Sequence, residues 1–248
     1  MKYVYFVVEG QHDIAAIGRI LKVFHEAKQI NNERNLDPFW RRLVPNRFPY
    51  KGYLLGRVPV PAFFQTKESS IAIHSSGGES DLIKTLKNTL NNLDQEELSA
   101  IALFCDADKK NAFDYFKELT KKLNDLPPFT NLSAPGQVSR TRPRTGIHVF
   151  PDNRQGGTLE TVLLECASIT YSDLLEEASK YIDNINQNYK EKWRPFDNLK
   201  AKVGCIANVL KPGKSNQVSI QDNDWICSKT EANPSLSMLK NFIEELLE

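Results

Sequence analysis

The chain has 248 residues, 40% of them hydrophobic, which is enough for one large domain or for one domain with a smaller appendage. Its 32 lysines and arginines balance 31 acidic residues, and the net charge of +1 excludes a global attraction to nucleic acid, to a membrane surface or to acidic substrates. Any site for a polyanion must therefore be a local patch.

The cysteines indicate a reducing compartment. They are far apart and form no paired C-x-x-C spacing, which argues against a zinc site or a disulfide scaffold: Cys105, Cys166, Cys205 and Cys227. No stretch approaches the roughly 20 apolar residues that a membrane span needs, and the N-terminus enters a strand without a cationic start and a cleavage site. We therefore expect a cytoplasmic protein with no membrane partner.

The first half of the chain predicts a strand, an acidic turn, a helix and then an irregular insertion. Residues 3–8 are β-branched and aromatic without polar alternation, as in a strand covered on both faces. From Asp13 onward the apolar residues follow helical spacing. Residues 29–70 are interrupted by five prolines and by short aromatic pieces, which predicts an insertion with short strands and no core of its own.

Further strands and helices alternate along the chain. Strands are expected at 71–74, 100–105 and 146–151, each followed by a helical pattern, and the turn "SSGGES" follows the first of them. Alternation of this kind predicts an α/β fold of the Rossmann-like type, with right-handed crossovers, a mainly parallel sheet and helices on both faces. We expect an α/β domain over residues 1–170 and a mostly helical extension packed on it over 171–248, with a last helix at 236–247.

Carboxylates follow two of the predicted strands. Glu9 follows the first strand and Asp106 the third, and ligands bind at the carboxyl ends of strands in open parallel sheets. In an extended chain Asp106 and Asp108 would point to the same side, with Cα atoms about 6.5 Å apart. Unpaired carboxylates in one crevice repel each other, and oxygen-only ligands favour Mg²⁺ or Mn²⁺. The pattern predicts a metal site at this edge.

Each piece also has a purely structural interpretation. Glu9 and Asp13 could favour the N-terminus of the helix through its dipole. "DAD" after a strand is often a turn followed by a helix cap. Glu160, in the first turn of a later helix, could serve as a capping residue. His12, beside the acidic turn, is either a solvated residue or an aid to proton transfer.

The order of the motifs resembles the Toprim domain of topoisomerases, bacterial primases and OLD-family nucleases. It is carried by "VVEGQHD", "SSGG" and "FCDAD" after three successive strands, and "GGTLETVLL" resembles the OLD-like branch. The wider pattern also resembles small standalone Toprim-like proteins. The resemblance implies a Toprim-like fold with Glu9, Asp13, Asp106 and Asp108 as catalytic residues. It also implies Glu9, Asp106, Asp108 and Glu160 as ligands of Mg²⁺ or Mn²⁺.

Two basic stretches could hold a nucleic-acid backbone, DNA or RNA. One stretch contains Arg140, Arg142 and Arg144, and Lys109 beside the acidic motif could act with it. The other stretch lies in the insertion and contains Arg41, Arg42, Arg47, Lys51 and Arg57. Aromatic residues of the insertion could stack on bases or could instead pack the insertion onto the domain: Trp40, Phe48, Tyr50 and Tyr53.

The sequence therefore predicts a magnesium-dependent enzyme acting on phosphodiester bonds, most plausibly a nuclease. The chain is too short for a topoisomerase, and no zinc ribbon of a primase is visible. The competing hypothesis is a non-catalytic Toprim module that binds nucleic acid or serves in an assembly. Because no ATPase domain such as that of OLD nucleases is present in the sequence, a separately encoded ATPase is a possible partner. The oligomeric state is left open.

Overall fold

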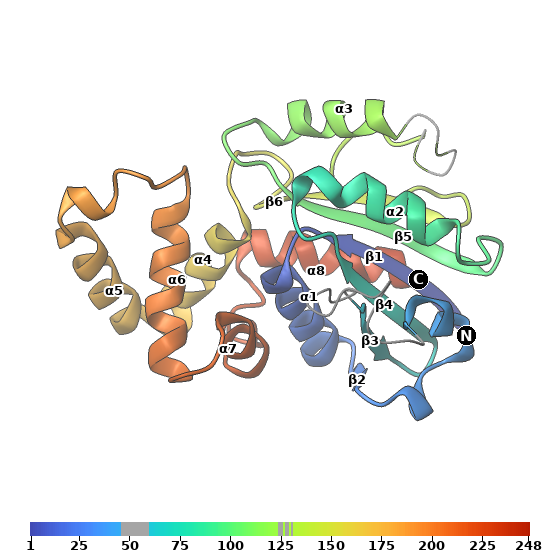
Figure 1. Cartoon of the computed structure of the whole chain (residues 1–248), viewed down its shortest axis with the longest axis horizontal. Coiled ribbons are helices and arrows are strands. Elements are labelled where there is room, and N and C mark those ends of the chain that lie inside the picture. Colours follow the sequence, from blue (N-terminus) through green and yellow to red (C-terminus); the bar gives the residue numbers. More distant parts are fainter. Residues whose placement is uncertain (46–59, 124–125, 127–128, 130) are drawn as a thin grey trace.

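The computed structural model of the chain describes residues 1–45, 60–123, 126, 129 and 131–248. Its centre is a six-stranded sheet in the order β2-β3-β4-β1-β5-β6 (Figure 1). The strands are β1 (Lys2–Val8), β2 (Lys28–Ile30), β3 (Ala62–Gln65), β4 (Ser69–Ser75), β5 (Leu98–Asp106) and β6 (Arg144–Phe150). β4, β1, β5 and β6 are parallel, whereas β2 and β3 form an antiparallel edge. The predicted mainly parallel α/β sheet is thus confirmed.

The central strand β1 lacks polar alternation because both of its faces are covered. Successive side chains of a strand point to opposite faces. Val4, Phe6 and Val8 belong to the hydrophobic core on one side of the sheet, and Tyr5 and Val7 belong to the core on the other side. Burial on both sides fixes the register of β1, because a slip by one residue would exchange these two sets.

Helices cover both faces of the sheet. The apolar residues of α1 (Gln11–Phe24), α4 (Leu159–Thr170) and α8 (Pro234–Leu247) join one core. Those of α2 (Leu82–Leu90) and α3 (Ala112–Lys122) join the other, and the two sets lie on opposite sides of the sheet in Figure 1. The last helix begins at Pro234, which confirms the prediction of a helix over 236–247 begun by Pro234 and Ser235, and the side chain of Asn233 caps it by accepting a hydrogen bond from Leu236 N at 3.0 Å.

The insertion contributes to the same sheet. Its short strands β2 and β3 extend the edge beside β4, and short 3₁₀ helices lie at Glu33–Asn35 and Pro38–Leu43. Trp40 is fully buried, and its Nε1 donates to Ser70 Oγ at 2.8 Å. Trp40 therefore packs the insertion onto the sheet, and the stacking on bases considered for it is wrong. Other residues considered for the insertion lie outside the described residues: Arg47, Phe48, Tyr50, Lys51, Tyr53 and Arg57.

Three helices of the C-terminal part form a lobe beside the sheet. α5 (Ser172–Asn184) and α6 (Asp197–Leu210) pack on each other and, through α6, on α4, while α7 (Asn216–Asp222) packs on α1 (Figure 1). We call α5, α6 and α7, with the connections between them, the helical lobe. The chain then returns as α8 to the sheet, where Phe242 contacts the ring of Phe104. Over the described ranges, none of the helices has the length and apolar character needed to cross a membrane.

The packing of α1 on β3 predicts opposite effects for two glycine-to-alanine changes. A Cβ at Gly18 would lie 2.6 Å from Cζ of Phe64, whereas a Cβ at Gly204 in α6 would meet nothing closer than 3.6 Å. We expect Gly18→Ala to lower the free energy of unfolding by about 1–2 kcal/mol through overpacking. Gly204→Ala should raise it by roughly 0.5–1 kcal/mol through helix propensity. Urea denaturation measures both, and equal stability of the two variants would contradict this packing.

Candidate acidic site

Carboxylates from distant parts of the chain meet at the carboxyl ends of β1 and β5. Glu9 follows β1, and Asp106 is the last residue of β5. The backbone N–H of Asp106 donates to Glu9 Oε1 at 2.9 Å. Residues 97 positions apart are therefore joined by a direct hydrogen bond. The parallel arrangement of β1 and β5 causes this meeting, because it brings both strand ends to the same edge.

Asp13 and Asp106 are each held by a backbone amide near the start of a helix. α1 begins at Gln11, directly after the turn at Gly10 as predicted, and Asp13 Oδ2 accepts from Gly10 N at 2.6 Å. Asp106 Oδ1 accepts from Leu159 N, the first residue of α4, at 2.9 Å. One oxygen of each carboxylate thus has a fixed structural role. The capping interpretation of Asp13 holds, and it leaves the second oxygen available for chemistry.

Burial and mutual repulsion make this cluster electrostatically costly. Burial, together with the charges of Asp13, Glu79 and Asp108, raises the pKa of Glu9 to about 8, against the lowering effect of the hydrogen bond from Asp106 N. Burial, with the charge of Glu160, raises the pKa of Asp13 to about 7. The pKa of Asp106 is raised well above its usual value by burial and by Asp13 and Glu9. Near neutral pH the cluster therefore holds protons unless a cation compensates it.

Glu160 differs from the other acids of the cluster because its pKa is lowered. It lies in the first turn of α4, and burial alone would raise the pKa of its carboxyl. Hydrogen bonds with His12, with Thr158 and with a backbone amide, and to a smaller extent the charge of Lys200, outweigh burial, so that its pKa is lowered. His12 Nδ1 lies 3.3 Å from Glu160 Oε1. His12 is thus more than a solvated neighbour of the turn, since it contacts a carboxylate of the cluster.

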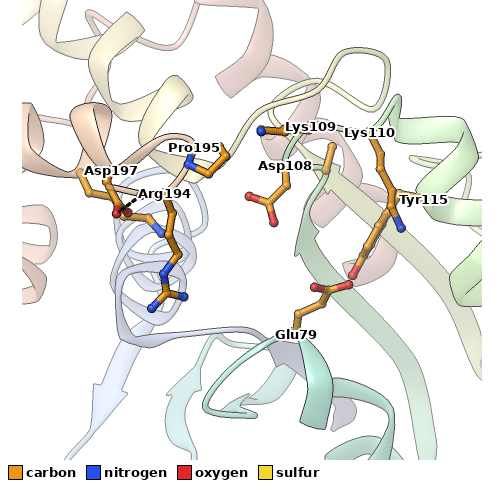
Figure 2. A pocket seen from close by; sticks show the side chains of 10 residues that line it. Glu79, Asp108, Lys109, Lys110, Tyr115, Arg194, Pro195 and Asp197 are labelled. Atoms are coloured by element: carbon orange, nitrogen blue, oxygen red, sulfur yellow. Dashed lines mark hydrogen bonds between the residues drawn. The ribbon is translucent and has the colours of Figure 1, made fainter. Parts of the chain in front are cut away.

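Asp108 does not continue the extended strand that was predicted for the "DAD" segment. Its φ of +50° turns the chain after Asp106, and its N–H donates to Gly157 O at 2.9 Å. The prediction that Asp106 and Asp108 point to the same side of an extended strand is therefore wrong, because the chain leaves the sheet at Ala107. Asp106 stays half-buried at the end of β5, whereas the exposed carboxylate of Asp108 points into an open pocket (Figure 2).

That pocket, which we call the acidic-edge pocket, has a volume of about 540 Å³. Sheet-edge loops, α3 and the helical lobe all line it (Figure 2). Its walls combine acidic and basic side chains with one tyrosine, and the lining residues include Glu79, Asp108, Lys109, Lys110, Tyr115, Arg194, Asp197 and Lys200. This size and mixed polarity suit a small charged ligand or part of a larger one.

Six of these residues were missed from the sequence: Glu79, Lys110, Tyr115, Arg194, Asp197 and Lys200. Glu79 lies in "SSGGES" directly after a strand, and the strand-end argument applied to Glu9 could have found it. Tyr115 follows the helical period of α3 and resembles a core residue. Nothing local distinguishes Arg194 and Lys200 from other surface cations, because the fold of the helical lobe alone brings them to the pocket.

The predicted basic residues are divided between two edges of the sheet. Lys109 lines the acidic-edge pocket. Arg144 begins β6, whereas Asp106 pairs with Phe150 at the other end of that strand, about 20 Å away. Arg144 Nη1 donates to Glu245 O at 2.6 Å, and Arg140 and Arg142 are exposed on the loop before β6.

The described arginines of the insertion are also remote from the pocket. Arg41 and Arg42 lie in the turn Pro38–Leu43, and Arg42 Nη1 donates to Asn92 O at 3.4 Å, just before β5 begins. The structure thus places the predicted arginines with described positions near the amino-end edge of the sheet. Phosphate contacts at the acidic edge must come from other cations.

The donor chemistry of the cluster fits a hard divalent cation, although its present geometry is open. Glu9, Asp13, Asp106 and Glu160 offer only carboxylate oxygens, which Mg²⁺ and Mn²⁺ prefer. Within the described ranges, however, no three His, Cys, Asp or Glu side chains are arranged as a ready-made coordination set. The carboxylates are close enough to raise one another's pKa, and side-chain rotations would be needed to form such a set.

The raised pKa values predict how stability depends on pH in the metal-free protein. The ordinary values are 4.5 for Glu9 and 3.8 for Asp13, and their folded values are about 8 and about 7. Between about pH 5 and pH 8 the folded state therefore binds more protons than the unfolded state, and the free energy of unfolding falls as pH rises. We expect urea denaturation with EDTA present to show a fall of up to about 1.4 kcal/mol per pH unit for each of the two groups.

Glu9→Gln should flatten this dependence, because glutamine keeps the acceptor for Asp106 N and removes the titrating group. Glu191→Gln, which changes an exposed glutamate of the helical lobe, should keep the wild-type slope. A Glu9→Gln curve parallel to that of the wild type would contradict the assignment.

Comparisons with known proteins place the whole chain in one family. A structural search finds a hypothetical protein from Pyrococcus horikoshii OT3 with a TM-score of 0.55 and 14% identity, covering 99% of this chain and 95% of that chain. At this identity the likeness shows the fold alone. The search of curated proteins gives no match. The family model "Protein of unknown function (DUF3226)" matches residues 4–248, so the chain belongs to that family.

Proposed function

We propose that the protein is a metal-dependent phosphodiesterase of nucleic acid, and most specifically a nuclease using Mg²⁺ or Mn²⁺. The observation that carries the proposal is the hydrogen bond between Asp106 N and Glu9 Oε1, which collects buried carboxylates beside a pocket lined by cations. Buried acids without compensating cations destabilise a fold, and a divalent ion between them offsets that cost. A phosphate bound at the same edge would meet the lysines and the arginine of the pocket.

The roles of the side chains follow from their positions. Glu9, Asp106, Asp108 and Glu160 would hold the ion, which when bound neutralises phosphate charge and lowers the pKa of a coordinated water. Glu9 Oε2 is the oxygen not engaged by Asp106 N, and it would accept a proton from the attacking water. Asp13 holds the turn before α1 in place through Gly10 N and adds negative charge.

Lys200 is the best-placed cation for a role beside the acids. It lines the acidic-edge pocket, and its charge favours the ionised form of both Asp108, whose pKa burial and Glu79 still raise, and Glu160, whose pKa is lowered. Among the described residues it makes no ion pair at short range. Its ammonium group would hold the two carboxylates ionised and contact a nonbridging oxygen of the phosphate.

The Toprim resemblance supports the same chemistry. The residues that carry it, Glu9, Asp13, Asp106 and Asp108, come from two strand ends that are neighbours in the sheet, and Glu160 joins them from α4. We propose on this basis that the parallel core is Toprim-like and related to that of OLD-family nucleases. DNA or RNA would be the substrate, and a separately encoded ATPase would be a regulatory partner.

One observation favours the alternative of a non-catalytic binding module. The acids of the described chain do not form a closed coordination set, and their raised pKa values show that they can remain protonated and neutral without metal. A protein that only binds nucleic acid could use the cations of the pocket alone. Metal binding and cleavage therefore need separate measurements.

Metal affinity should increase with pH. Mg²⁺ or Mn²⁺ must displace protons from Glu9 and Asp13, whose pKa values are about 8 and about 7. We expect titration calorimetry to show stronger binding at pH 8 than at pH 6, with proton release, and a metal-dependent rise in melting temperature. Equal affinity at both pH values would mean that the ion binds elsewhere.

Cleavage should depend on the two central acids. We expect wild-type protein with Mn²⁺ or Mg²⁺ to cut single- or double-stranded DNA or RNA, and Glu9→Gln and Asp106→Asn to lower the rate by roughly 100-fold or more. Asparagine at 106 keeps an acceptor for Leu159 N, so a loss of rate would not report unfolding. Glu191→Gln serves as the control.

Rates unaltered by both substitutions would place the activity elsewhere or assign it to a contaminant. Intact binding of nucleic acid without cleavage under every metal condition would favour the non-catalytic module.

A further inference from the structure

The helical lobe forms one wall of the acidic-edge pocket. Arg194, Pro195, Asp197 and Lys200 come from the segment that leads into α6 and from its first turns, whereas Lys110 and Tyr115 belong to the opposite wall (Figure 2). The acidic site on the sheet is therefore half of a two-sided pocket. The other half comes from a part of the chain about 90 residues further on.

The backbone around Arg194 is held in an unusual conformation. Arg194 N donates to Asp197 Oδ2 at 2.7 Å, and Pro195 restricts its own φ. Phe196 then has a φ of +68°, a left-handed conformation that non-glycine residues adopt at a cost of about 1 kcal/mol or more. This turn orients Arg194 so that its guanidinium group extends toward the pocket (Figure 2).

The guanidinium group of Arg194 has no protein partner in the described part of the chain. No carboxylate there lies within 4.0 Å of it, and its neighbour Asp197 is occupied by the backbone N–H of Arg194 itself. Lys110, by contrast, is paired with Glu118. Arg194 is exposed, so its charge stays hydrated in the free protein and is available to an anion.

We infer that Arg194 binds a phosphate of a nucleic-acid strand across the pocket from Asp108, so that the helical lobe is the substrate-binding wall of the site. The planar guanidinium group can donate two parallel hydrogen bonds to phosphate oxygens. Glu79 and Asp108 occupy the other side of the opening and repel an anion there. A phosphodiester strand is therefore drawn toward the lobe wall, with Lys109 and Lys200 beside it.

This inference deepens the proposed function and rests on it for the identity of the polyanion. It assigns different roles to the two walls of the pocket. The sheet edge supplies the acids, and the helical lobe supplies the cation that positions the nucleic-acid strand. Arg194 is thus a substrate-binding residue, and its loss should weaken binding while leaving the acids in place.

The test compares Arg194→Ala with Lys192→Ala, which removes an exposed cation of the same segment that does not line the pocket. Binding of short single-stranded DNA and RNA is measured by fluorescence anisotropy in EDTA, over a series of salt concentrations. Because EDTA prevents metal-dependent cleavage, the measurement is independent of activity. Cleavage is measured separately with Mn²⁺.

We expect Arg194→Ala to weaken binding about 5–10-fold and to lower the slope of log K against log salt by about 0.7, the value for one phosphate contact on a single strand. Lys192→Ala should change neither quantity. Arg194→Lys should restore the salt slope but only part of the affinity, because lysine keeps the charge and loses the two-point geometry. In the cleavage assay, Arg194→Ala should raise KM more than it lowers kcat.

The outcomes separate the two proposals. Cleavage by the wild type, with Arg194→Ala equal to Lys192→Ala in affinity and salt slope, overturns the inference and leaves the nuclease proposal intact. Arg194-dependent binding without cleavage under any metal condition supports the inference and overturns the nuclease proposal. Failure of the wild-type protein to bind either strand overturns the inference.

Discussion

The hydrogen bond from Asp106 N to Glu9 Oε1 joins the ends of two parallel strands and brings a carboxylate into a buried position. Asp106 is in turn held by Leu159 N, and Asp13 is held by Gly10 N. Three acids are thus fixed by backbone amides at one edge of the sheet. The arrangement keeps their orientation and leaves their mutual repulsion unrelieved, and this constraint underlies the electrostatic behaviour of the whole site.

Two routes can relieve that repulsion. The acids can stay protonated, as the raised pKa values of Glu9, Asp13 and Asp106 indicate for the metal-free protein. A divalent cation can also replace the protons, and this connects metal affinity, pH and stability in a single equilibrium. Glu160 follows a third route, because His12 and Lys200 compensate its charge within the protein. In the metal-free protein, Glu160 is therefore the acid of the cluster whose ionised form is favoured. Glu9, Asp13 and Asp106 would lose their protons when a cation binds.

The helical lobe changes the interpretation of the sheet-edge site. Viewed alone, the ends of β1 and β5 would form an acidic surface that repels phosphate. The segment before α6 adds Arg194 and the first turn of α6 adds Lys200, and these two cations bring positive charge to the acidic-edge pocket. A pocket whose walls carry both acids and cations suits a phosphate that is bound together with a metal ion. The return of α8 to the sheet anchors both ends of the lobe to the same core.

The sequence by itself determined the elements whose signals are local. Apolar runs identified β1 and β5 because both faces of these strands are buried, and the strand-helix alternation predicted the parallel core. The same parallel topology correctly indicated that Glu9 and Asp106 would lie at one edge. The tertiary structure alone decided the geometry of Asp108, because the residues of the "DAD" motif do not by themselves indicate a positive φ at its last position.

The structure also decided which cations reach the site. Arg140, Arg142 and Arg144 form an obvious basic cluster, yet they lie at the amino end of β6, remote from the acids. Arg194 and Lys200 are unremarkable in sequence and line the pocket because α6 packs on α4, whose first turn carries Glu160. Contacts between residues distant along the chain depend on how whole elements pack, and local spacing carries no record of that packing.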